Sequence, residues 1–287
     1  MFGTIKNEGP GMKSFKGYAF GMLLSMVLPT AIQAAEVQIT APSGEVSIYQ
    51  TAALLAHPEA REIVITTDNA YGQDMTYRAV PLISLIGDAN SVDDQTGLEV
   101  IALDGFVANI PVPLIVREGE ENAQAWLAIE PDSAPWPNLP GKDVSAGPFS
   151  VVWVNAAASH IRSEQWPYQV SKIGYAEFPA ARWPQLALAD GAPDNAQQGQ
   201  SIFIDQCFAC HRMNGAGITE LGPDLNLPMN PVDYFKPDAL FMLIRDPATV
   251  RQWQDMQMHG FSEEQLSDDE IHNVIAYLTE MSTRKAE

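Results

Sequence analysis

The chain has 287 residues, of which 46% are hydrophobic, and this excludes a disordered protein and leaves room for one large or two ordinary domains. Its 16 basic and 36 acidic residues give a formal net charge of -20. Such a charge repels nucleic acid and anionic lipid and favours encounter with a basic protein, although solubility alone accounts for it equally well. We expect no nucleic-acid partner.

Residues 1–35 have the pattern of an export signal peptide. Three lysines precede a short apolar run over residues 18–28, and Pro29 and the small-residue segment AIQAAE follow it. We predict cleavage after Ala34. An uncleaved anchor is the alternative, but a bilayer span needs about 20 apolar residues and Pro29 interrupts this run early. In either case the rest of the chain is predicted to lie in the periplasm, attached to the membrane only if the leader is retained.

Residues 36–177 are predicted to form a β-rich α+β domain. Helix signals there are few and short, namely Thr51 to His57 and the segment PLISLIG. Eight short segments rich in Val, Ile, Tyr and Trp show the alternating or continuous apolar runs of strands: VQITA, EIVITTD, MTYRAV, LEVIAL, FVANIPV, AWLAIE, FSVVWVN and YQVSKIGYA.

The pattern changes after residue 177. Residues 178–195 contain three prolines and little alternation, and this composition predicts a linker. Residues 196–287 are predicted to form a small all-α domain, because hydrophobic residues recur there at three- and four-residue intervals. Ser267 and Glu270 have the spacing of a capping box at the start of the last predicted helix.

The segment IDQCFACHRMNG contains the one strong chemical motif of the chain, formed by Cys207, Cys210 and His211. Two thiols three residues apart on a helical turn can each form a thioether with a haem vinyl group, and the adjacent histidine can bind the iron. A zinc site would need four ligands, and the chain has no other cysteine. A thioredoxin-type dithiol would follow a strand, whereas this approach is helical. We therefore predict covalent haem attachment, and the export signal supports it independently because such attachment is completed outside the cytoplasm.

Residues 196–282 resemble a class I cytochrome c on this motif and on further ones. The further motifs are GQSIF, GPDL, LIRDP, MHGF and LSDDEIHNVIAYL. The resemblance implies one covalent haem c with His211 as the proximal iron ligand. It also implies that Pro223 faces this histidine through its backbone carbonyl, and that Tyr277 lies where the last helix crosses the first.

The second axial ligand has three candidates. In that family a methionine lies three residues before an aromatic residue, and Met258 with Phe261 satisfies this spacing. The proline that usually follows the methionine is replaced by His259, so Met256 and His259 stay open as alternatives. Methionine ligation would occupy both axial positions and raise the reduction potential relative to bis-histidine, which suits electron transfer rather than catalysis at iron.

Residues 36–177 resemble the molybdopterin-binding fold of the sulfite-oxidase type. The similar segments are MTYRAVPLISLI, LDGFVANIPVPL, AGPFSVVWVN and SEQWPYQVSKIGYAE. Those enzymes bind molybdenum through a cysteine thiolate, and this part of the chain has no cysteine. The resemblance therefore implies the fold without its cofactor, and we expect no molybdopterin.

These patterns together predict a periplasmic monohaem c-type cytochrome that transfers electrons between a redox enzyme and another carrier. Its N-terminal domain would dock to a redox protein with a basic face or serve as a scaffold. The alternatives are a haem-containing oxidoreductase subunit with a catalytic molybdopterin site, and a haem-based redox sensor. An electron-transfer protein, or a subunit of an oxidoreductase complex, is favoured over an enzyme.

Overall fold

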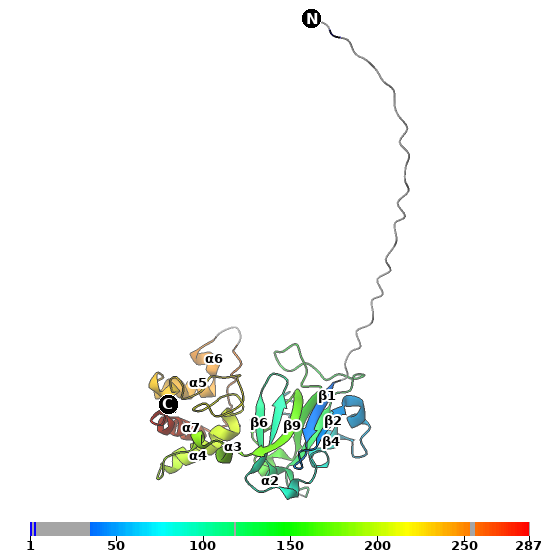
Figure 1. Cartoon of the computed structure of the whole chain (residues 1–287), viewed down its shortest axis with the longest axis horizontal. Helices are drawn as coiled ribbons and strands as arrows, with labels where there is room; N and C mark the ends of the chain where they lie inside the picture. The colour runs from blue at the N-terminus through cyan, green and yellow to red at the C-terminus, as the bar shows by residue number, and fades with distance from the viewer. Residues whose placement is uncertain (2, 4–34, 118, 253–255, 287) are drawn as a thin grey trace. The chain divides into compact units, whose positions relative to one another are not determined.

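The N-terminal part of the chain builds two β-sheets (Figure 1). The first sheet has five strands in the order β2-β1-β9-β5-β6, and the second has four in the order β3-β4-β7-β8. All neighbouring strands are antiparallel except β1 and β9, which are parallel. The strands are β1 (Glu36–Thr40), β2 (Val46–Gln50), β3 (Arg61–Ile65), β4 (Met75–Pro81), β5 (Thr96–Ala102), β6 (Val107–Pro111), β7 (Gln124–Ile129), β8 (Phe149–Val154) and β9 (Val170–Glu177).

The computed structural model describes residues 1, 3, 35–117, 119–252 and 256–286. The predicted signal peptide, with its lysines, its apolar run and its cleavage site, therefore lies outside the described residues. No helix within the described ranges combines the length and the apolar character needed to span a membrane.

All eight predicted strands are confirmed, and the reason is visible in their burial. One core contains side chains of both sheets, such as Leu98 of β5 and Leu127 of β7. A second core covers the other face of the four-stranded sheet, where Trp126 and Val152 are buried. Strands β7 and β8 therefore bury both faces, which explains their continuous apolar sequences.

Strand β2 was not predicted from the sequence. This edge strand exposes Val46 and Ile48, with 52% and 60% of their surface accessible, so its aliphatic residues do not mark a buried face. Of the helices predicted in this part, α1 covers Thr51–Leu55, and PLISLIG forms only a 3-10 turn over Leu82–Ser84. The further short helix α2 covers Val112–Ile115.

The C-terminal part is helical, as predicted (Figure 1). Helix α4 continues into a π-helical turn, η6, and the later helices α5 and α7 share one hydrophobic core with them. The short helix α6 follows α5 in the chain. The capping box is confirmed, because Ser267 Oγ accepts from the backbone of Glu270 while the Glu270 carboxylate accepts from the backbone of Ser267. The bounds are α4 (Asp194–Ile202), η6 (Phe203–Cys207), α5 (Pro237–Arg245), α6 (Pro247–Val250) and α7 (Asp268–Ser282).

Residues 178–195, predicted as a linker, pack on the helical core. They contain helix α3 (Pro179–Arg182) and a 3-10 turn over Pro184–Leu186. Leu186 is completely buried in this core, and Trp183 packs against it. From residue 35 onward, the described residues form one compact unit.

Candidate functional site

The turn that follows η6 brings the two cysteines and the histidine together. The backbone carbonyl of Cys207 accepts from the N–H groups of Cys210 and His211, at 3.1 and 2.8 Å. Both cysteines are free thiols and half-buried. One turn of chain therefore presents two thiols and an imidazole, as the CxxCH motif predicts.

His211 is held in one defined tautomer. Its Nδ1 lies 2.9 Å from the carbonyl oxygen of Pro223, which is the contact that the resemblance implies. A carbonyl can only accept, so Nδ1 donates and the neutral ring keeps a lone pair on Nε2. Burial lowers the pKa of His211 and so favours this neutral form. Gly222 fits closely against the ring, because an added Cβ would lie 2.6 Å from Nδ1.

These residues fit a haem c. Two free thiols can form the two thioethers, and an imidazole with a free Nε2 can serve as the proximal ligand. Burial, together with the nearby Glu164 carboxylate, raises the pKa of each of the Cys207 and Cys210 thiols to about 12. When bound, the haem supplies an iron that gains and loses one electron.

The candidates for the second axial position lie in different surroundings. Met258 is half-buried and packs against the helical core, and Met256 is half-buried without belonging to that core. The His259 side chain is 56% exposed, and its Nε2 lies 3.0 Å from Glu164 Oε1. The hydrogen bond to this carboxylate raises the pKa of His259.

Tyr277 supports the helices around the site. It is completely buried on α7, its ring centroid lies 5.1 Å from that of Phe203, and its hydroxyl donates to the carbonyl of Leu186 at 2.9 Å. Beside it, α4 approaches α7 at Gly199, where an added Cβ would overlap the carbonyl oxygen of Asn273. The crossing that the resemblance implies thus needs a glycine at this position.

The β-rich part also contacts the turn that carries Cys207 and Cys210, through residues that were not predicted from the sequence. Val107 N donates to the carbonyl of Ala209 at 3.3 Å, and Ser163 Oγ donates to Gln206 Oε1 at 2.9 Å. An ion pair of 2.6 Å between Arg162 and Glu270 lies between the same two parts of the chain. No local sequence pattern could have indicated these contacts, because the partners are far apart in the chain. Ser163 and Gln206 are separated by 43 residues, and Arg162 and Glu270 by 108.

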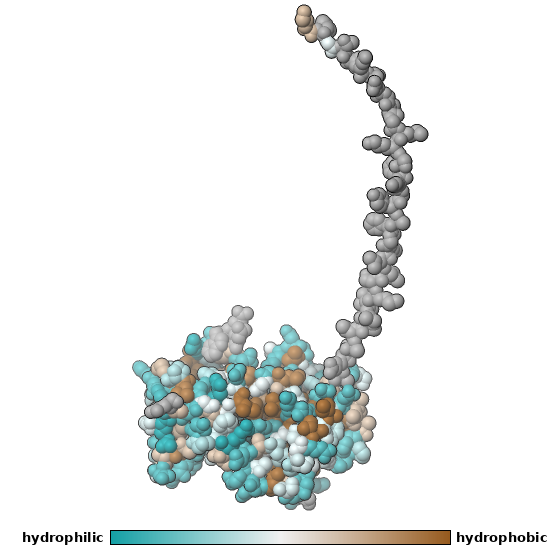
Figure 2. Space-filling model, viewed as in Figure 1, coloured by the Kyte–Doolittle hydropathy of each residue, from teal (hydrophilic) through white to brown (hydrophobic). Residues whose placement is uncertain are grey.

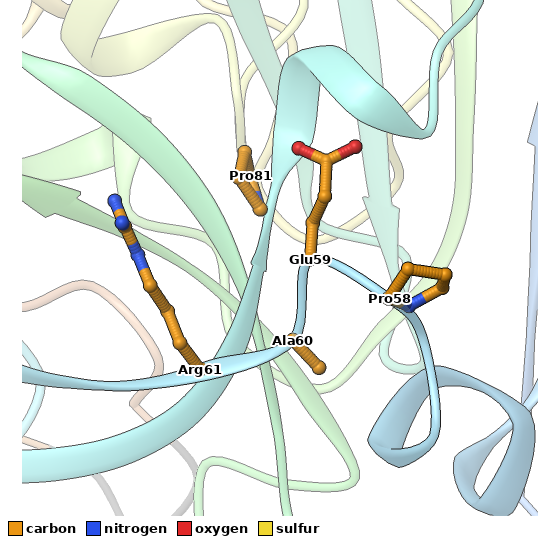
Figure 3. A pocket seen from close by; sticks show the side chains of 5 residues that line it. All are labelled: Pro58, Glu59, Ala60, Arg61 and Pro81. Carbon is orange, nitrogen blue, oxygen red and sulfur yellow. The ribbon is translucent and has the colours of Figure 1, made fainter.

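A depression of about 330 Å³ lies in the β-rich part, beside the start of β3 (Figure 3). Its lining residues are Pro58, Glu59, Ala60, Arg61 and Pro81. The Glu59 carboxylate accepts from Ser84 Oγ at 2.8 Å, and the Arg61 guanidinium lies 4.4 Å from the Trp126 ring, so both charged groups have partners. The lining offers a single carboxylate, which is already hydrogen-bonded, and no serine, cysteine or histidine. Among the described residues no group of three or more His, Cys, Asp or Glu side chains is placed to hold a metal ion.

Comparison with known families identifies the C-terminal part. Residues 196–282 match the cytochrome c family, and no curated protein matches the chain. The C-terminal part is therefore a cytochrome c domain with covalently bound haem c, and the Cys207 and Cys210 pair fits its CxxCH-type site. This domain gives the protein a haem-based electron-transfer role. The match does not extend to the β-rich part, whose sulfite-oxidase-like fold stays a prediction.

Proposed function

We propose that the protein is a periplasmic monohaem cytochrome c that passes electrons between a redox enzyme and another carrier. The observation that carries this proposal is the hydrogen bond from His211 to Pro223, because it leaves Nε2 free for the iron on one side. Met258 packs against the same core and would supply the second iron ligand when haem is bound. An iron held by both residues would exchange electrons without offering an open position to a substrate.

The first test is ligand binding. We expect carbon monoxide to leave the optical spectrum of the reduced protein unchanged, while a chemical reductant and oxidant cycle the haem completely. A protein that binds carbon monoxide readily would have an open iron site, and a ligand-binding or catalytic role would replace the proposed one. Metal analysis tests the molybdopterin alternative, for which we expect iron without molybdenum.

The sixth ligand is tested by two matched methionine variants. Met258→Ala should abolish the near-infrared sulfur-to-iron band of the oxidised protein and open the reduced haem to carbon monoxide, because the thioether is removed. Met256→Ala should keep the band, since this side chain is not part of the helical core. If the wild-type protein lacks the band, His259 is favoured as the second iron ligand. If only Met256→Ala loses the band, Met256 is the ligand.

The β-rich part serves as the docking or scaffold module in this proposal. Hydrophobic residues gather over the part of its surface where Figure 1 draws β6, β9 and β1 (Figure 2). Exposed apolar side chains in and beside this sheet are Val46 and Ile48 on the edge strand β2, and Leu103 in the turn before β6. Together with the net charge of -20, these side chains suit a protein partner that has an apolar contact within a basic face.

A charge-introducing variant tests this docking role. Replacing Val46 and Ile48 by lysine should slow reduction of the haem by the exported-protein fraction of the cells that make it, because two charges interrupt an apolar contact. Reduction by ascorbate should be unchanged. The matched control is Val64→Lys, at a valine with 60% exposed surface on β3 of the other sheet. Equal reduction rates for all variants would count against docking through β2.

A further inference from the structure

Glu164 is a buried carboxylate on the β-rich part. It belongs to a 3-10 turn, η4 (Ser163–Gln165), that lies between β8 and β9, and only 7% of its surface is exposed. Its Oε1 lies 3.0 Å from His259 Nε2 and 3.4 Å from Ser163 Oγ. Among the described residues its ion-pair partner is His259.

This turn lies directly against the haem-attachment segment. Ser163, which precedes Glu164, donates to Gln206, which precedes Cys207. Glu164 itself contacts His259, which follows the ligand candidate Met258 in the chain. The β-rich part thus places a buried carboxylate between the segment that attaches the haem and the segment that holds the candidates for the second iron ligand.

The charge of Glu164 is not neutralised by Arg162, which lies two residues before it in the chain. Arg162 instead pairs with Glu270 at 2.6 Å, so the imidazole of His259 balances Glu164 only when it is protonated. A buried charge acts more strongly than an exposed one, because protein screens it less than water does. Since ferric iron carries one more positive charge than ferrous iron, a nearby carboxylate favours the oxidised state.

We propose that Glu164 sets the reduction potential of the haem held by Cys207 and Cys210. The β-rich part is then a component of the redox centre in addition to any docking role. This inference depends on haem attachment and is independent of the identity of the partner.

The test is a redox titration of the haem-loaded full-length chain. Glu164→Gln should shift the midpoint potential to a more positive value, and the charge-conserving Glu164→Asp should stay near the wild type. The titration is run well above the pH range in which imidazole is charged, so that His259 is neutral in every variant. The matched control is Glu62→Gln, at an exposed carboxylate on β3. We expect this variant to keep the wild-type potential.

A second set of variants separates charge from contact. His259→Gln alters the hydrogen-bond partner without removing the carboxylate, so we expect a smaller shift than in Glu164→Gln; equal shifts would overturn the proposal. The near-infrared band shows whether axial ligation is retained. If Glu164→Gln loses that ligation, the comparison is made in the Met258→Ala background, where the sulfur ligand is absent with and without the change at Glu164. A positive shift caused by Glu164→Gln supports the proposal, and an unchanged potential refutes it.

Discussion

Replacing Cys207 and Cys210 together by serine should abolish covalent haem attachment completely. A hydroxyl does not form the thioether, and the chain has no other cysteine that could take over. The structure places both thiols on one turn with His211, so all three groups act on a single haem. On a denaturing gel the double variant should show no haem-stained band, and its haem should be extractable into acidified acetone.

The two single cysteine variants should lose only part of the covalent haem attachment. Cys207→Ser and Cys210→Ser each keep one thiol, and we expect each to retain a weaker stained band through the remaining thioether. Met256→Ala is the matched control and should stain as strongly as the wild type. A stained band in the double variant would contradict the haem assignment.

Gly199→Ala should lower the free energy of unfolding by about 1–3 kcal/mol, the usual effect of overpacking. An added Cβ would overlap the carbonyl oxygen of Asn273 and lie 3.0 Å from Cβ of Tyr277, so α4 and α7 would have to separate. The sign of the change in unfolding free energy is informative, because a glycine-to-alanine substitution in an unobstructed helix is stabilising by about 1 kcal/mol. Denaturant unfolding followed by the haem absorbance measures the difference.

Ser201→Ala is the matched control for this substitution. Ser201 lies on the same helix, α4, and is exposed, so alanine gains helix propensity there without a clash. We expect its stability to equal or slightly exceed that of the wild type. A Gly199→Ala protein as stable as Ser201→Ala would show that the two helices do not cross as closely as the structure describes.

Local patterns predicted much of the secondary structure. The strands were predictable because their apolar runs reflect burial on one or both faces, and the capping box of Ser267 and Glu270 involves residues only three positions apart. Strand β2 was missed because Val46 and Ile48 are exposed on an edge, where burial does not shape the sequence. PLISLIG has the composition of a helix but forms one 3-10 turn, since its neighbours in the fold outweigh its local preference.

The sequence by itself determined the chemistry of the cofactor, because Cys207, Cys210 and His211 are adjacent in the chain and one helical turn is enough to assemble them. Only the tertiary structure decided which distant residues complete the surroundings of that turn. Ser163, beside Glu164, donates to Gln206, and Val107 donates to the backbone carbonyl of Ala209. Both contacts arise from the packing of separate elements. Such packing depends on how side chains of the whole core fit together, so a local sequence pattern does not predict it.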